Sequence, residues 1–502
     1  MSDQSRALPH QPSLRYLKLE AKRRLSAGEF ATLHDAQLAI AREHGQPSWT
    51  ALKQLVEAGP ALAQARWVIS RFAGAGGPGW AAPADAELRE HFDEDYLRLV
   101  PAATMTQVLT RVADQLRGDL VVTAGTPLGL RAEISGLRLE AAAQAEPPYR
   151  LTRLRLYPLG QRVTDPRVTA PPAATSGTVP AAAAAVAEEA WAELGLPGLV
   201  IAGASGEDGA ASEDGAGEWA AARGWASLDP AQALRPGHRF PVYSITKLVT
   251  STAVLRLVAD GRVGLDDPAN RHLRAIRLAD GTVTIRELLS HTGGVASPGE
   301  LFAGRVPSLA ALTGPVVACS GPRGSFAYSN GGYAMLGQLI ADVTGTPYPD
   351  AAAALVLGPL GMSGSSFPAS WPEAGAVTGY RMAGDGTFEP APAEVSTLPA
   401  AGGLWATAPD LVRFGLGWAS LLPGELAREA IRPHAVQRAG GPEVGLGWLL
   451  NRPRDVSGQV GGGPAASSSL IVVPSTGRVS VAMTSRMVPI EPVNARLARI
   501  IA

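Results

Sequence analysis

The stretch from Phe240 to Asp260, FPVYSITKLVTSTAVLRLVAD, constrains the fold more than any other part of the sequence. Apolar residues recur around most of the circumference of the helix that it predicts, so this helix must lie in the interior. They are Ile245, Leu248, Val249, Val254, Leu255, Leu257 and Val258. Ser244 and Lys247 are three residues apart, which places them on one helix face with Cβ atoms about 5–6 Å apart. The chain therefore folds around a helix that buries a lysine beside a serine.

Lysine is scarce in this arginine-rich chain, and Lys247 is the only lysine after Lys53. Arginine cannot lose its proton in a protein, whereas the pKa of a desolvated lysine can fall toward neutrality. We therefore interpret Lys247 as a residue kept for its chemistry. The alternative is a surface lysine near a helix start, with Ser244 as the N-cap.

The composition places the chain among globular proteins. Its 502 residues favour more than one domain, and 46% hydrophobic with 18% charged residues excludes a disordered or fibrous protein. The net charge of −1 argues against a nucleic-acid partner, and the basic stretch 11–24 is too short to change that. A single cysteine, Cys319, excludes an intrachain disulfide.

The sequence predicts a cytoplasmic protein with no membrane partner. The first 16 residues lack a charged segment followed by an apolar one, so no ordinary secretory signal is expected. Residues 181–202 come nearest to a membrane span, but they carry Glu188, Glu189 and Glu193.

Residues 1–58 are expected to form an N-terminal helical module, with helices at Leu14–Leu25, Leu33–Glu43 and Ser48–Glu57. The phrase DAQLAIAREHGQPSWTALKQLVEAG resembles a short helical module found ahead of ankyrin repeats in bacterial proteins. The resemblance implies an accessory element without activity. Residues 1–160 are therefore where we expect a protein partner or self-association.

Residues 59–162 are expected to form a small α+β domain. Helical periodicity at Ala61–Phe72 and Thr104–Leu116 precedes four strand-like runs, which favours helices on one face of an antiparallel sheet. The strands are predicted at Leu120–Thr123, Leu128–Ile134, Leu137–Ala142 and Arg150–Tyr157. This unit resembles cystatin-like or nuclear-transport-factor-like domains. The glycines between Gly74 and Gly79 follow a helix and include a proline, so we interpret them as a loop and not a dinucleotide site.

Residues 163–180 are rich in Pro, Ala, Thr and Ser and read as a linker. Residues 181–502 form the last expected domain, whose sheet strands come from both of its ends. A helix at Ala181–Leu194 precedes strands at Gly198–Ala204 and Trp219–Trp225, and further strands follow at Ser468–Val473 and Val479–Thr484. This predicts an antiparallel sheet flanked by helices, with a mostly helical subdomain in between.

Two further motifs carry chemical groups. Tyr328 and Asn330, in FAYSNGG, are two residues apart and would face the same side of an extended segment. The segment GQVGGGP, residues 458–464, precedes a strand, and its glycines allow backbone to approach a ligand closely.

These motifs occur in the order seen in the serine β-lactamase and penicillin-binding-protein superfamily, and the chain resembles its class C-like branch, which includes family VIII esterases. The phrases that carry the resemblance are SITK, YSN, the glycine-rich segment, LGLPG, DGRVGLDDP, VTIRELLSHTGGV, LGPLGMSGSSF and GGLWATAPDLVRFG. They run the length of residues 181–502.

The resemblance implies a division of labour. Ser244 is the acylated nucleophile, and Lys247 and Tyr328 are the groups available to take its proton. A lysine cation beside Tyr328 favours the phenolate, so the two would titrate as a unit. The substrate would be bound by Asn330, Gln459, Gly461 and Gly462, and the backbone N–H groups of Ser244 and Gly462 would form the oxyanion hole.

Gln459 stands where the third motif of the superfamily usually has lysine or histidine. A cation there would bind a substrate carboxylate through a contact worth about 1.5–3 kcal/mol. Glutamine offers no charge, which predicts a relative preference for neutral esters or amides.

His291, in SHTGG, invites a Ser-His-Asp triad, but no G-x-S-x-G elbow accompanies it, and in the superfamily this phrase is a structural turn. No metal-binding motif occurs, and we expect neither a metal nor another cofactor.

The sequence thus predicts a serine hydrolase that acts on small carboxylic esters, with amides or β-lactams as further candidate substrates. One alternative is a β-lactamase or D-amino-acid peptidase of the same superfamily. The other is a ligand-binding or sensor protein without turnover, favoured by the lost cation at Gln459. Specificity is expected in the loops at 295–325 and 363–400.

Overall fold

The computed structural model describes residues 14–43, 48–57, 59–75, 77, 79–100, 105–106, 109–110, 112–117, 120–126, 128–134, 137–158, 163–168, 171–204, 217–299, 301–372, 374–383, 385–437 and 442–501. The chain forms two compact units, residues 1–161 and 162–502. Each unit is described by itself.

The first unit begins with helices. They are α1 (Leu14–Ser26), α2 (Leu33–Glu43), α3 (Trp49–Glu57), α4 (Gly59–Phe72), α5 (Asp85–His91) and α6 (Glu94–Leu99), followed by a 3-10 turn, η1 (Ala113–Leu116). The helices expected in residues 14–72 are present with nearly the same bounds. Of the helix expected at 104–116, residues 104, 107, 108 and 111 lie outside the described residues, 105–106 and 109–110 are helical, and its last four residues form η1.

A four-stranded antiparallel sheet completes the first unit. Its strands, in spatial order, are β1 (Val121–Thr126), β2 (Gly129–Ile134), β3 (Leu137–Ala143) and β4 (Leu151–Pro158). Alternate residues of β3 are buried, which gives the sheet one apolar face that packs against α4. The unit is α+β, as expected. Its resemblance to cystatin-like or nuclear-transport-factor-like domains and its division near residue 58 stay predictions.

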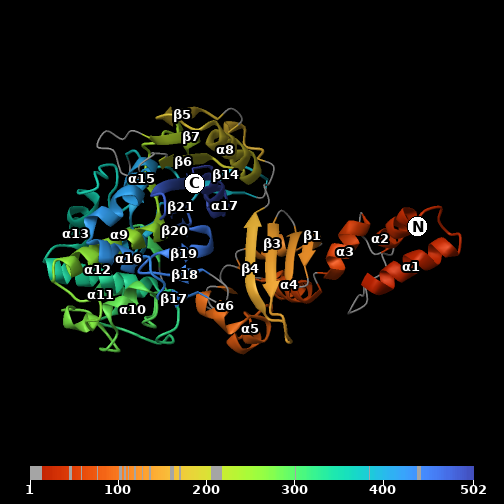
Figure 1. Cartoon of the computed structure of the whole chain (residues 1–502), viewed down its shortest axis with the longest axis horizontal. Coiled ribbons are helices and arrows are strands. Elements are labelled where there is room, and N and C mark those ends of the chain that lie inside the picture. Colours follow the sequence, from red (N-terminus) through yellow and green to blue (C-terminus); the bar gives the residue numbers. More distant parts are fainter. Residues whose placement is uncertain are drawn as a thin grey trace. The chain divides into compact units, whose positions relative to one another are not determined.

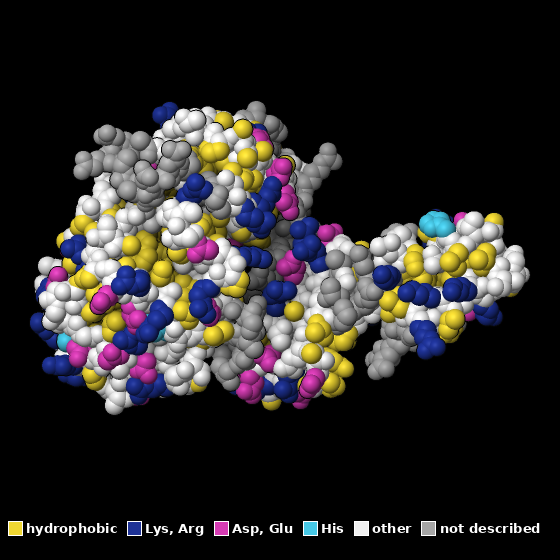
Figure 2. All heavy atoms as spheres, in the orientation of Figure 1, with side chains coloured by type: hydrophobic (Ala, Val, Ile, Leu, Met, Phe, Trp, Pro, Cys, Tyr) yellow, Lys and Arg dark blue, Asp and Glu magenta, His cyan; other side chains and the backbone are white. Residues whose placement is uncertain are grey.

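Helix α1 presents a basic face to solvent. Lys18 and Lys22 are exposed together with Leu19 and Tyr16, whereas Leu17 and Ala21 on the other side are buried. Figure 2 shows Lys and Arg side chains gathered beside hydrophobic ones over the N-terminal helices. The expectation of a partner surface in residues 1–160 stays a prediction.

The second unit is organised around one long antiparallel sheet (Figure 1). Its spatial order is β17-β18-β19-β20-β21-β22-β6-β7-β5, with β8 beside β7. The bounds are β5 (Ala173–Ser176), β6 (Gly198–Ala204), β7 (Glu218–Leu228), β8 (Ala231–Ala233), β17 (Ala435–Val436), β18 (Glu443–Val444), β19 (Leu449–Asn451), β20 (Val456–Gly463), β21 (Ala466–Val473) and β22 (Arg478–Thr484). The strand pairs expected at the two ends of residues 181–502 meet in the middle, where β22 pairs with β6.

Helices cover both faces of this sheet. On one face, α8 (Ala181–Leu194) and α17 (Glu491–Ile501) pack on Leu199 and Ile201 of β6. On the other face, α15 (Ala408–Gly417) and the helical subdomain pack on Val200 and Ala202. Every residue of β6 is buried, as its uniformly apolar sequence predicts for a central strand.

The subdomain between β7 and β17 is built around α9 (Thr246–Ala259), which follows the 3-10 turn η3 (Tyr243–Ile245). The expectation of a buried helix is confirmed, since nearly all of α9 is inaccessible to solvent. The other helices are α10 (Ile285–Leu289), α11 (Leu309–Thr313), α12 (Asn330–Thr344), α13 (Tyr348–Ala352), α14 (Pro399–Gly402) and α16 (Gly424–Ala430). Short strands complete it: β9 (Phe240–Pro241), β10 (Arg277–Leu278), β11 (Phe302–Ala303), β12 (Val316–Val317), β13 (Tyr380–Met382), β14 (Phe388–Pro390), β15 (Val395–Ser396) and β16 (Trp405–Ala406).

The stretch 163–180 was expected to be a linker, but in the structure it packs within the second unit and contributes a strand to its sheet. Asp165 is buried and ion-paired with Arg167, and Ala173–Ser176 form β5, which pairs with β7 at the sheet edge. Alanine and threonine can continue a strand edge, which composition alone does not distinguish from a spacer.

Among the described residues, no helix has the length and apolarity needed to cross a bilayer.

Candidate active site

The candidate nucleophile Ser244 lies at the start of α9. Phe240 and Pro241 of β9 pair with β16, and the Val242 N–H donates to the Leu404 carbonyl, which fixes the entry into η3. Tyr243, the residue before the serine, has φ of 46°, a left-handed conformation that is costly for a residue with a side chain. Ser244 is half-buried at the end of this constrained turn.

Four side chains that the sequence singled out form one hydrogen-bonded cluster. The Ser244 Oγ lies 2.6 Å from the Tyr328 hydroxyl and 3.1 Å from the Lys247 Nζ. Lys247 Nζ also donates to Asn330 Oδ1 at 2.9 Å. Ser329 is extended and caps α12, so Tyr328 and Asn330 on either side of it reach the same cluster. The structure therefore brings together Ser244, Lys247, Tyr328 and Asn330.

Lys247 is fully buried, and it contacts one group that the sequence could not reveal. Its Nζ donates to the Ala401 carbonyl at 2.7 Å. That carbonyl comes from the last turn of α14, where helical C=O groups lack intrahelical partners. No side-chain pattern marks such an acceptor, because it is a backbone atom.

Burial sets the protonation of the cluster. It lowers the pKa of the Lys247 ammonium from 10.5 to about 7. It also raises the pKa of Tyr328 to about 12, against a smaller opposing effect of the hydrogen bond with Ser244. The expectation of a phenolate stabilised by the lysine cation is therefore wrong for the free protein, since desolvation outweighs that attraction. At neutral pH the tyrosine keeps its proton, and the lysine is the group that can lose one.

The contacts of Lys247 fix the direction of the hydrogen bonds. A neutral amine has two N–H groups and one lone pair. Asn330 Oδ1 and the Ala401 carbonyl only accept, so they take the two N–H groups. The lone pair then faces Ser244, whose hydroxyl can donate to it, while the protonated Tyr328 donates to Ser244 Oγ. The cluster can therefore withdraw the serine proton through Lys247 without moving any side chain.

The glycine-rich strand β20 borders the cluster. β19 pairs with β20 only as far as Gly458. On that edge, residues 459–463 of β20 therefore have no neighbouring strand, and they pack against η3 instead. A Cβ on Gly461 would lie 2.0 Å from the Val242 carbonyl, so only glycine permits this approach. The Val460 N–H donates to the Gln459 side chain and so points away from β21, and the Gly462 N–H must point the same way.

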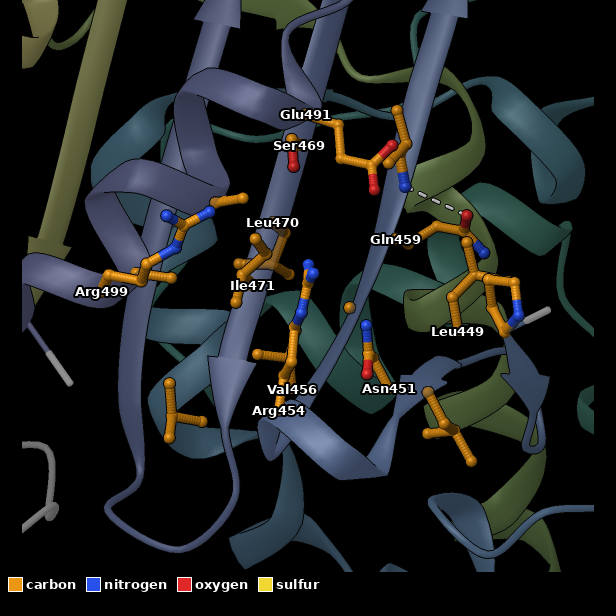
Figure 3. A pocket seen from close by; sticks show the side chains of 17 residues that line it. Leu449, Asn451, Arg454, Val456, Gln459, Ser469, Leu470, Ile471, Glu491 and Arg499 are labelled. Atoms are coloured by element: carbon orange, nitrogen blue, oxygen red, sulfur yellow. Dashed lines mark hydrogen bonds between the residues drawn. The ribbon is translucent and has the colours of Figure 1, made fainter. Parts of the chain in front are cut away.

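Gln459 is buried and is held by backbone groups. Its Nε2 donates to the Gly447 carbonyl at 3.1 Å, and its Oε1 accepts from the Val460 N–H at 3.0 Å. Figure 3 shows its position on β20. No hydrogen bond joins Gln459 to the cluster around Ser244 within the described part of the chain.

The sequence did not predict that His291 packs next to the Ser244 cluster. It is buried, with φ of 60°, and its ring lies 4.6 Å from the Tyr328 ring. Its Nδ1 accepts from the Ser329 N–H at 3.1 Å, and burial lowers its pKa well below the usual value. It touches neither Ser244 nor Lys247 through a hydrogen bond in the described residues, so it is no triad member. The residue types in SHTGG gave no signal of this packing role.

The two segments expected to hold specificity meet next to this site. β11, from the first, pairs with β15, from the second. Phe302 of β11 lies edge-on against Tyr243, with ring centroids 5.7 Å apart. Among the residues that the structure describes, no group of His, Cys, Asp and Glu has the arrangement of a metal site.

This fold is that of the serine β-lactamase and penicillin-binding-protein superfamily of serine hydrolases. The Beta-lactamase family model matches residues 183–502, and the chain belongs to that family. Two relatives are penicillin-binding protein 4 of Amycolatopsis lactamdurans (34% identical, 34% of this chain and 48% of that protein) and esterase EstB of Burkholderia gladioli (35% identical, 31% and 44%). The chain spans about half the length of the curated relatives it matches.

Solved structures agree on the fold. A penicillin-binding protein from Bacillus halodurans has a TM-score of 0.53 at 21% identity, over 64% of this chain and all of that one. A D-stereospecific amidohydrolase from Streptomyces sp. has a TM-score of 0.51 at 25% identity, over 63% of this chain and 97% of that one.

Proposed function

We propose that the protein is a serine hydrolase that cleaves small carboxylic esters through an acyl-enzyme on Ser244. The observation that carries the proposal is the setting of Lys247. It is fully buried with a pKa of about 7, and of its three hydrogen-bond partners only Ser244 can donate a proton to it. A base in this position converts a poor serine nucleophile into an effective one.

In the proposed acylation, Ser244 Oγ attacks the ester carbonyl carbon while its proton passes to the Lys247 amine. The carbonyl oxygen becomes an oxyanion. The N–H of Gly462 supports its stabilisation, because it points to the edge of β20 that β19 leaves free beyond Gly458. The second donor in this proposal is the N–H of Ser244 itself.

The tetrahedral intermediate then expels the alkoxide. Tyr328 keeps its proton at neutral pH and lies 2.6 Å from Ser244 Oγ, so it is the acid that protonates the leaving oxygen. Tyr328 is left as a phenolate and Lys247 as an ammonium, because Ser244 Oγ, the group between them, is now an ester oxygen that cannot relay a proton. Water next attacks the acyl-enzyme with the same groups acting in reverse, which releases the carboxylic acid and restores Ser244.

The substrate class follows from charge. Gln459 replaces the usual cation, and its amide is engaged by Gly447 and Val460, so nothing at this position attracts a substrate carboxylate. This favours neutral esters over β-lactams and peptide C-termini, both of which carry a carboxylate. EstB, named as an esterase, is among the relatives, which supports the same choice. A β-lactamase or a D-amino-acid peptidase is the alternative within the family.

One observation favours a different class of function. Without a cation at Gln459, the domain could hold a ligand without turning it over and act as a sensor. Mass spectrometry distinguishes the proposed hydrolase from a sensor without turnover. A fluorophosphonate and a slow acylating β-lactam are incubated with the full chain, and hydrolysis of p-nitrophenyl acetate is followed in parallel.

The proposed enzyme gives a fluorophosphonate adduct on Ser244, steady ester turnover and loss of turnover on labelling. Ser251, a buried serine on the same helix whose hydroxyl donates to the Leu446 carbonyl, is the matched position that stays unlabelled. A folded protein with no adduct on Ser244 from either probe contradicts the proposal and supports the sensor.

A further inference from the structure

A cavity lies on the α17 face of the β20–β21 sheet, whereas Ser468 points from the other face toward Val242, near Ser244. It has a volume of about 410 Å³, within the range of small-molecule sites. α17 forms one wall and the strands β19, β20 and β21 form the other (Figure 3). Gln459 contributes to its lining, but the reacting groups of the proposed hydrolysis, Ser244, Lys247 and Tyr328, do not.

Small residues on the helix create the space. α17 turns Ala495 and Ala498 toward the cavity, and their short side chains leave a gap between helix and sheet. The sheet contributes an apolar floor that includes Val456 and Ile471. Such a surface gains free energy when it is covered by hydrocarbon.

Two exposed cations line this apolar space. Figure 3 shows Arg454 on the sheet side and Arg499 beside α17, with Glu491 on α17 toward the other end. Eight residues of helix separate Glu491 from Arg499, a distance of roughly 12 Å along the axis.

Arg454 and Arg499 differ from the neighbouring arginines, which are ion-paired. Arg452, in the same turn as Arg454, holds Glu443 with two contacts of 2.6 and 2.7 Å. Arg496, one helical turn before Arg499, pairs with Glu189. Arg454 and Arg499 have no acidic partner among the residues that the structure describes. Their guanidinium groups are therefore free for an external anion.

We propose that this cavity binds an amphipathic carboxylate, a straight-chain fatty acid. The carboxylate lies between Arg454 and Arg499, and the hydrocarbon chain covers Ile471 and Ala498. A small inorganic anion leaves the apolar floor exposed, and an uncharged hydrocarbon leaves both guanidinium groups unpaired. Glu491 repels the carboxylate from the other end and so fixes the orientation.

Calorimetric titration of the full chain tests the site, with laurate as the probe and dodecanol as its uncharged counterpart. Laurate is expected to bind with one site per chain and at least about tenfold more tightly than dodecanol. The double variant Arg454→Gln/Arg499→Gln is expected to remove that preference. Its matched control is Arg452→Gln/Arg496→Gln, which changes two paired arginines on the same two segments and leaves laurate binding unchanged.

Two further measurements test whether the probes bind in this cavity and not at Ser244. Ala498→Trp fills the cavity and is expected to abolish binding of both probes, with folding checked by circular dichroism. Protein labelled on Ser244 with fluorophosphonate is expected to bind laurate as before. Loss of binding on labelling, equal affinity for laurate and dodecanol, or unchanged binding in the Arg454/Arg499 variant would each overturn the proposal.

Discussion

The imidazole of His291 lies against the phenol ring of Tyr328, with ring centroids 4.6 Å apart. His291 also accepts hydrogen bonds from the backbone N–H groups on either side of Tyr328. Its carbonyl accepts from the Ala327 N–H at 2.8 Å, and its Nδ1 accepts from the Ser329 N–H at 3.1 Å. The left-handed φ of 60° lets carbonyl and side chain face one segment together. His291 is therefore a positioning residue for Tyr328.

This role predicts a difference between two variants at position 291. Asparagine and glycine both tolerate a positive φ, but only asparagine can accept from the Ser329 N–H. We expect His291→Gly to lower kcat for an alkyl ester such as ethyl acetate, whose alkoxide must be protonated as it leaves, by roughly 10²-fold with little change in KM, because Tyr328 loses its alignment. His291→Asn should recover most of that loss. Equal activity of the two variants contradicts the positioning role, and thermal melting controls for folding.

The pKa of Lys247 predicts the pH dependence of the reaction. The base must be unprotonated, so kcat/KM should rise with pH through an apparent pKa of about 7. No fall is expected at moderately alkaline pH, because burial raises the pKa of Tyr328 to about 12. Lys247→Arg should lower kcat/KM by roughly 10³-fold and abolish the rise, since arginine keeps its proton. Lys22→Arg, on the exposed face of α1, is the matched control. A pH-independent rate in the wild type would exclude Lys247 as the base.

Much of the second unit follows from patterns in the sequence, because those patterns report burial. The helix around Lys247 is apolar on most faces, and β6 is uniformly apolar, which leaves few alternatives to a covered sheet. The order of motifs then places Ser244 with Tyr328 and Asn330. The role of Ala401 was not predictable, because it acts through a carbonyl that only the fold brings near.

The protonation states of Lys247 and Tyr328 could not be predicted from the sequence either. Spacing shows that lysine and tyrosine are neighbours, but the balance between attraction and desolvation depends on how completely Lys247 is buried. The side chain of Gln459 illustrates the same limit. Its residue type predicts a missing charge, whereas its bonds to Gly447 and Val460 depend on where β19 ends.

The buried Lys247 also predicts a pH-dependent cost in stability. Its pKa is lowered from 10.5 to about 7, so between these values the unfolded chain holds a proton that the folded chain does not. The wild type therefore gains stability as pH rises through this window, by about 1.4 kcal/mol per pH unit from this group. Lys247→Met removes the effect. The difference in unfolding free energy, Lys247→Met minus wild type, should be largest at or below pH 7 and shrink toward pH 10.5. A difference that is constant with pH, measured by urea denaturation, would mean that the lysine is not perturbed.

The neutral side chain at position 459 predicts how specificity can be shifted. Gln459→Lys keeps a donor for the Gly447 carbonyl and adds a cation at the free edge of β20, where a substrate carboxylate would lie. A charge-assisted contact of this kind is worth about 1.5–3 kcal/mol, so kcat/KM for nitrocefin should rise by about tenfold or more. The rate for the uncharged p-nitrophenyl acetate should stay constant or fall, because the lost acceptor for the Val460 N–H disturbs the strand edge. Gln232→Lys, on the exposed strand β8, adds the same charge away from the site and should change neither rate. Parallel changes for both substrates would show that position 459 acts on the fold of β20 and not on the charge of the substrate.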